Sequence, residues 1–121
     1  MSAIDDCLAE ALTLPGVRLV TLLDYVGGLP IAARGEDPLS AEEDASGTAD
    51  FVQRALATPA LTASESGDSV EELIVVGAGG THVILLGGEA MCLHTVLEPG
   101  TDLTTARARL RDVLHRLVAP V

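Results

Sequence analysis

The order of its segments constrains this sequence more than any single motif does. A one-sided helical pattern opens the chain, and two strand-like runs separated by Tyr25-Val26-Gly27-Gly28 follow it. A helical stretch of small residues comes next, and then three short strand-like runs between glycine-rich turns. An amphipathic stretch after Pro99-Gly100 closes the chain. Helical ends around a strand meander predict a compact α+β fold, with a single domain over residues 1–121.

Two helices are indicated by apolar residues at helical spacing. Ser2 offers a capping box with Asp5 for the first helix, which should end at Pro15-Gly16. The last helix should begin after Pro99-Gly100, with Thr101 or Asp102 as its cap. The apolar stripe of the first helix is Ile4, Cys7, Leu8, Ala11 and Leu12. That of the last is Leu103, Ala106, Leu110, Val113, Leu114, Leu117 and Val118.

The helix in the middle of the sequence is expected to run from Ser40, as its cap, to about Thr58, with Pro59 ending it and a polar loop over 60–70. Its expected buried stripe consists mostly of small residues: Ala41, Ala45, Thr48, Val52 and either Leu56 or Ala55. Small side chains bury little area, at ~0.8 kcal/mol per CH₂ group, but they allow a neighbouring element to approach closely. The stripe therefore fits a thin cover on a sheet and an interface with another molecule equally well.

Five strands are predicted from β-branched and aliphatic runs between turns. They are Val17 to Asp24, Leu29 to Arg34, Glu72 to Val76, Thr81 to Leu86 and Met91 to Leu97. Pro30 cannot donate a ladder hydrogen bond, so the second strand should lie at a sheet edge. The strand at 72–76 is apolar on both faces, and if it is also an edge, it needs a partner.

Composition argues against several classes of function. The net charge is −11 and the chain has no lysine, so phosphate backbones and anionic membrane surfaces should repel it. One Tyr, one Phe and no Trp give no platform for base stacking. Residues 1–14 lack the basic start of a signal peptide and no apolar run approaches ~20 residues, so a cytoplasmic location is expected. In that location Cys7 and Cys92 are expected to be reduced and buried.

The candidate catalytic and ligand-binding residues favour structural roles. Gly77-Ala78-Gly79-Gly80 precedes a strand, whereas a phosphate-binding fingerprint opens a helix. His82 and His94 lie on adjacent predicted strands and could approach each other, but no carboxylates at metal-ligand spacing accompany them. Cys92 and His94 share a strand face without a recognisable oxyanion loop. We therefore predict no catalytic residue, no metal site, no cofactor and no enzymatic activity.

Four stretches in order resemble the Roadblock/LC7 domain family over residues 3 to 119. They are Leu14-Pro15-Gly16-Val17, then Leu22-Leu23-Asp24 with Gly27-Gly28-Leu29-Pro30, then Glu71 to Val76, and Glu98-Pro99-Gly100-Thr101-Asp102-Leu103. Family members often have Asp-Gly at the first hairpin, where this chain has Tyr25-Val26-Gly27-Gly28. The short, Ala- and Arg-rich chain further looks like the bacterial roadblock members of actinomycete conservon modules, which also hold a sensor kinase and a small GTPase.

The resemblance implies an αββαβββα roadblock, profilin-like fold: a five-stranded antiparallel sheet with helices one and three on one face and helix two on the other. It also implies a homodimer in which the edge strand after helix two pairs with its copy and the second helices become neighbours. This shifts the interpretation of the small-residue helix toward an interface. The dimer-interface residues expected on this basis are Ala45, Thr48, Val52, Leu73 and Val75. The expected partner-binding residues are Glu43, Asp50 and Arg54.

In function, the resemblance implies a noncatalytic homodimeric regulator or adaptor that binds a Ras-like small GTPase in a bacterial signalling module. The alternative is a structural scaffold that joins a sensor kinase or another signalling protein without acting on a GTPase. A third hypothesis, a small-molecule sensor or an enzyme of related topology, requires a polar-lined cavity.

Overall fold

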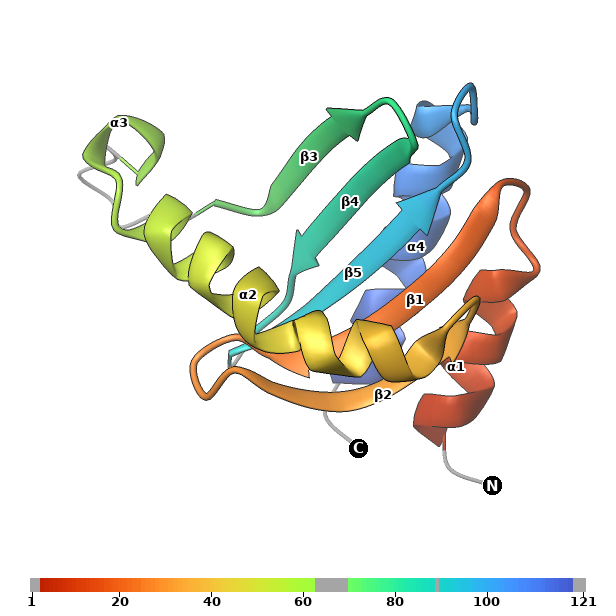
Figure 1. The fold of residues 1–121 in the computed structure, drawn as a ribbon, viewed down its shortest axis with the longest axis horizontal. Coiled ribbons are helices and arrows are strands. Elements are labelled where there is room, and N and C mark those ends of the chain that lie inside the picture. The colour runs from red at the N-terminus through yellow and green to blue at the C-terminus, as the bar shows by residue number, and fades with distance from the viewer. Residues whose placement is uncertain (1–2, 63–69, 89, 119–121) are drawn as a thin grey trace.

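A computed structural model of the chain describes residues 3–62, 70–88 and 90–118, and shows an antiparallel sheet between helices (Figure 1). The helices are α1 (Ala3–Leu12), α2 (Pro38–Leu56), α3 (Pro59–Thr62) and α4 (Leu103–Val118). The strands are β1 (Val17–Asp24), β2 (Leu29–Gly35), β3 (Glu72–Gly77), β4 (Gly80–Leu86) and β5 (Met91–Leu97). The predicted α+β class and the five predicted strands are confirmed.

The sheet has the strand order β2-β1-β5-β4-β3. β2 lies at one edge, as Pro30 predicted, and its pairing with β1 carries an irregularity between Leu22 and Leu23. β3 lies at the other edge and pairs with β4 from Glu72 opposite Leu85 to Gly77 opposite Gly80. The strand that is apolar on both faces is therefore an edge strand, with one of its two backbone edges unpaired among the described residues.

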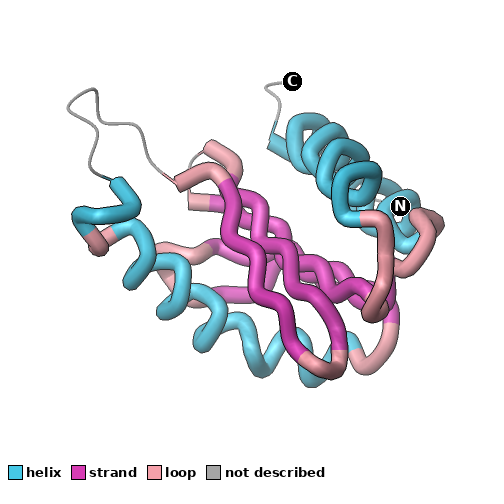
Figure 2. Tube along the Cα trace, turned by 90° about the horizontal axis from the view of Figure 1, so that it is seen from above, coloured by secondary structure: helices cyan, strands magenta, loops and turns pink. Residues whose placement is uncertain are grey.

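The helices form layers on both faces of the sheet. α1 and α4 cover one face, whereas α2 runs across the other (Figure 2). The core under α1 and α4 is aliphatic and includes Leu8, Leu22, Leu93 and Leu110, each fully buried. The core under α2 is built from smaller residues, among them Ala45, Ala49 and Val52. This matches the layer arrangement that the resemblance implied.

α2 begins three residues earlier than predicted. Asp37, in a left-handed conformation with φ of 49°, is its cap, and the Asp37 carboxylate accepts a hydrogen bond from the Ser40 N–H at 3.3 Å. Pro38 fits the first helical turn, where its missing N–H costs nothing. The helix ends at Leu56, and Pro59 starts the short α3 where a polar loop was predicted. The rest of that loop, residues 63–69, and the Ser2 cap lie outside the described residues.

The other predicted caps and spans need few corrections. Asp102 caps α4, because its carboxylate accepts hydrogen bonds from both the N–H and the hydroxyl of Thr105. An ion pair between Arg116 of α4 and Glu10 of α1 joins the two helices on their shared face.

Within residues 3–62, 70–88 and 90–118, none of the helices is both long and apolar enough to span a bilayer.

Candidate functional site

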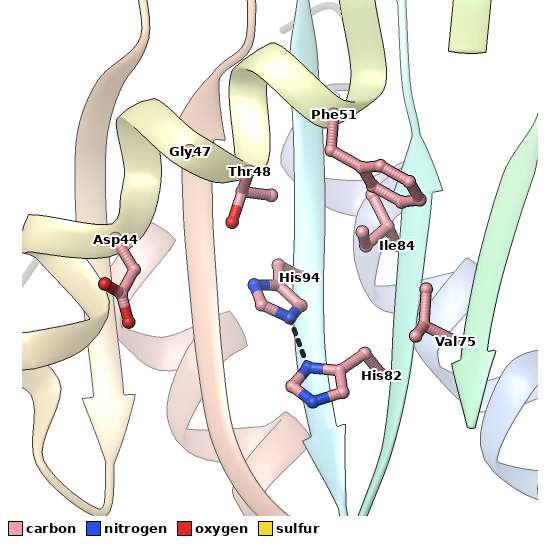
Figure 3. A pocket seen from close by; sticks show the side chains of 8 residues that line it. All are labelled: Asp44, Gly47, Thr48, Phe51, Val75, His82, Ile84 and His94. Atoms are coloured by element: carbon pink, nitrogen blue, oxygen red, sulfur yellow. Dashed lines mark hydrogen bonds between the residues drawn. The ribbon is translucent and has the colours of Figure 1, made fainter. Parts of the chain in front are cut away.

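An open groove lies between α2 and the part of the sheet that α2 leaves open. α2 packs over β1 and β2, so the β4–β3 half of the same face is uncovered (Figure 1). The groove has a volume of about 450 Å³. Its lining consists of Asp44, Gly47, Thr48 and Phe51 from α2 and Val75, His82, Ile84 and His94 from the sheet (Figure 3).

The α2 wall of the groove is a second stripe beside the buried one. Residues 44, 47, 48 and 51 follow the i, i+3, i+4, i+7 pattern that places side chains on one helix face. Phe51, the one phenylalanine of the chain, is 45% exposed there. Gly47 has no heavy atom of the described residues within 4 Å of the position a Cβ would take, so the wall is lowest at this point. Sequence reasoning missed Gly47 and Phe51, although their spacing was readable.

The floor of the groove follows from strand alternation and register. Val75 of β3 lies opposite His82 of β4, and Ile84 of β4 lies opposite His94 of β5. These residues point to the face that carries α2, because side chains two apart on a strand share a face. The floor is therefore an apolar surface with two imidazole rings at its centre.

The two rings form a hydrogen-bonded pair, as their strand positions suggested. His82 Nδ1 and His94 Nε2 are 2.9 Å apart, and the ring centroids are 5.2 Å apart (Figure 3). Burial, and then the charge that His82 can carry, lower the pKa of His94 to about 4, against the opposing influence of Asp44. At neutral pH His94 is thus uncharged, and one ring nitrogen of the pair donates to the other.

Cys92 lies on the same strand face as His94 but does not act with it. Its side chain is fully buried, and burial followed by the nearby Asp24 charge raises the thiol pKa to about 12. The group is a thiol at neutral pH, which is unsuited to nucleophilic attack. Among residues 3–62, 70–88 and 90–118, no three His, Cys, Asp or Glu side chains are arranged to hold a metal ion.

The expected interface residues divide into two groups. Thr48 and Val75 line the groove, and Leu73 is half-buried beside it. Ala45 and Val52 are 2% and 0% exposed, because they pack on the sheet of their own chain. Their side chains are thus not available to a second molecule in this structure, and the small-residue stripe serves as a thin cover.

The open edge of β3 borders the groove. Ile74, Val75 and Val76 are 38%, 41% and 76% exposed, so this edge combines apolar side chains with a backbone that no described residue pairs on its outer side. Such an edge favours pairing with another strand.

The expected partner-binding residues lie together on another part of α2. Glu43, Asp50 and Arg54 are all exposed and recur at i, i+7 and i+11, which places them on one outward-facing strip of the helix. The structure therefore brings the three residues together, away from the buried stripe.

Comparison with known proteins gives matches in structure. No family model and no curated protein sequence matches the chain. A Roadblock/LC7 domain from Streptomyces avermitilis has a TM-score of 0.83 at 17% identity over 96% of this chain and 95% of its own. MglB from Myxococcus xanthus has a TM-score of 0.84 at 19% identity, over 97% and 93%. A structure described as MglB with tetrameric arrangement has a TM-score of 0.82 at 18% identity, over 97% and 89%.

Proposed function

We propose that this chain, which has the Roadblock/LC7 fold, forms a homodimer and serves as a noncatalytic adaptor for a Ras-like small GTPase. The observation that carries the proposal is the continuous apolar surface formed by the β3 edge and the groove beside it. Covering both features with one partner removes their apolar surface from water, which is favourable. The expected single domain over residues 1–121 is part of the proposal.

A second copy is the occupant that this surface fits. Antiparallel pairing of β3 with the β3 of a second copy extends the sheet and satisfies the backbone groups at both edges. The same two-fold arrangement brings α2 of each copy toward the groove of the other, next to Thr48 and Phe51. Gly47 allows close approach there because it carries no side chain. The tetrameric arrangement described for an MglB of the same fold supports self-association.

The GTPase is assigned to the outward strip of α2. In the dimer the two α2 helices become neighbours, so Glu43, Asp50 and Arg54 of both copies form one charged surface. The resemblance to Roadblock/LC7 proteins implies a Ras-like GTPase as the partner for such a surface. Since the groove is covered by the second copy, the adaptor binds its partner through this surface and inserts no catalytic residue.

Self-association is tested by placing a charge on the β3 edge. Val75→Lys should shift the chain from dimer to monomer at micromolar concentration in light scattering, because a buried lysine at the strand pair is unpaired. Val26→Lys is the matched control, since Val26 is 66% exposed on the β1–β2 turn, away from the groove. A wild-type chain that is monomeric throughout contradicts the proposal.

The partner is tested with purified bacterial Ras-like small GTPases, each loaded with GDP or with a GTP analogue. We expect nucleotide-dependent complex formation and a changed rate of GTP hydrolysis. The triple variant Glu43→Arg, Asp50→Arg, Arg54→Glu should lose at least tenfold in affinity while remaining dimeric. Glu98→Arg, on an exposed loop, should retain it. If the chain shows no nucleotide-dependent binding and no change in the hydrolysis rate, the regulator hypothesis is wrong.

A further inference from the structure

The histidine pair on the groove floor gives the proposed dimer surface a proton-sensitive element. His82 and His94 are joined by one hydrogen bond of 2.9 Å beneath the wall formed by Thr48 and Phe51. We propose that protonation of this pair weakens docking of a second copy, so that self-association depends on pH. The inference rests on the proposed dimer and concerns the regulation of that surface.

The chemistry of the pair permits one proton between the facing nitrogens. A neutral imidazole has one N–H donor and one nitrogen acceptor, so His82 Nδ1 and His94 Nε2 bond only when one is protonated and the other is not. A first added proton can go to the outward nitrogen of the donating ring, which keeps the hydrogen bond and makes the pair positively charged. A second proton, on the facing acceptor, turns two donors toward each other, so the hydrogen bond is lost and the rings separate or rotate toward water.

The position of the pair links this event to the interface. His82 lies opposite Val75 of the edge strand, and His94 lies opposite Ile84 on the groove floor. A charged imidazolium requires water, whereas a second copy in the groove removes it. Docking therefore favours the neutral pair, and a protonated pair favours the open groove.

The charged group nearest the pair opposes the effect of burial. Among the residues that line the groove, Asp44 of α2 is the carboxylate, and its negative charge favours protonation of His94. Arg18, Glu36 and Asp37 line the adjoining cleft, which shares Asp44. Arg18 is paired with Glu36 at 3.0 Å. On β5, Cys92 remains a neutral thiol.

Burial outweighs Asp44, because burial is the largest cause of the lowered pKa of His94. Covering the groove adds to that burial, so the pKa falls further in the dimer. Association should therefore be strongest above about pH 5 and weaken as the pH falls through the His94 pKa of about 4. Each released chain takes up one proton, two per dimer, which changes the dimer dissociation constant by up to about a hundredfold per pH unit.

The test is the dimer dissociation constant of the full chain by sedimentation equilibrium between pH 6.5 and 3.5. We expect the wild-type constant to rise at least tenfold over this range. The variant His82→Asn, His94→Gln places amide groups where the two bonded nitrogens stand, and it should keep a hydrogen bond but lose the pH dependence. His115→Gln, at an exposed position of α4, should keep the wild-type dependence.

The outcomes separate this inference from the proposed dimer. A monomer at every pH overturns both. A dimer whose dissociation constant stays flat, or falls, toward pH 3.5 overturns the inference alone, as does an equal rise in the double variant. Imidazole nitrogen NMR of the wild-type chain provides a readout independent of the variants. It should show complementary tautomers at pH 7.5, and a His94 ring that is still neutral at pH 3.5 in the monomer contradicts the mechanism.

Discussion

Gly35 shows how one residue can fix the junction between a strand and a helix. It has φ of +120° at the end of β2, just before the Asp37 cap of α2. A Cβ at this position would lie 2.3 Å from the Arg18 carbonyl oxygen and 2.9 Å from Leu19 Cα. Both atoms belong to the backbone of β1 and cannot rotate away, so the glycine is required for conformation and for space.

We predict that Gly35→Ala lowers the free energy of unfolding by more than about 2 kcal/mol, since it adds a backbone clash to the cost of a left-handed conformation. Gly100→Ala is the matched control: its φ is +82°, with no heavy atom of the described residues within 4 Å of the added Cβ. It should cost only about 1 kcal/mol. Urea denaturation midpoints measure both, and equal losses would contradict the role of the clash.

Single residues in the groove divide into those that the sequence could identify and those that it could not. The approach of His82 and His94 followed from two adjacent strands with known alternation. Thr48 was placed on the buried stripe, but it lines the groove and Ala49 takes the buried position. The reason is that α2 buries Ala41, Ala45, Ala49 and Val52 against the sheet. In a helix of mostly small residues the buried and exposed faces differ little in hydrophobicity, so the sequence does not show which face is buried.

At the level of elements, α4 packs the apolar stripe that the sequence predicted into the core. Ala106, Leu110, Val113 and Leu114 of this helix are buried against the sheet and α1. The sequence predicted this stripe because long aliphatic side chains at helical spacing leave one possible orientation. It could not predict the start of α2, since Asp37 and Ser40 are both acceptable caps locally and the hydrogen bond from Ser40 N–H to the Asp37 carboxylate decides between them.

We predict that Leu110→Ala lowers the free energy of unfolding by ~2–5 kcal/mol, because it leaves a cavity in the core under α4. Leu110 is fully buried. Arg109→Ala, an exposed neighbour on the same helix, should change it by less than about 0.5 kcal/mol. Chemical denaturation followed by far-ultraviolet circular dichroism gives both values, and a negligible loss for Leu110→Ala would contradict the assigned core.

The cap of α4 should give the stability a dependence on acid. Hydrogen bonds from the Thr105 hydroxyl and then the Thr105 N–H lower the pKa of Asp102. A lowered pKa means that the ionised carboxylate stabilises the fold above its usual pKa and that this contribution is lost as the pH falls through the lowered value. Asp102→Ala should therefore reduce the melting temperature at pH 7, and the difference from wild type should shrink as the pH falls through the lowered pKa of Asp102. A difference that stays constant with pH would exclude ionisation as its cause.

For the whole molecule, the fold and the charge act in opposite directions. The groove and the β3 edge favour a second copy, whereas each chain carries a net charge of −11. Two such chains repel each other over the distance that salt does not screen, about 10 Å at 0.1 M ionic strength. The layer order was predictable from the pattern of strands and helices, whereas the shape of the groove depends on where α2 lies across the sheet.

This opposition predicts that salt strengthens self-association. Raising sodium chloride from about 20 to 300 mM shortens the screening length from about 20 to 6 Å, so the repulsion between the acidic chains weakens while the apolar contact does not. We expect the dimer dissociation constant at pH 7.5 to fall several-fold in sedimentation equilibrium. Glu43→Gln, Asp50→Asn, which removes two charges from each α2 outside the groove, should reduce this salt dependence and tighten the dimer at low salt. Dissociation on addition of salt would instead show that ion pairs hold the two copies together.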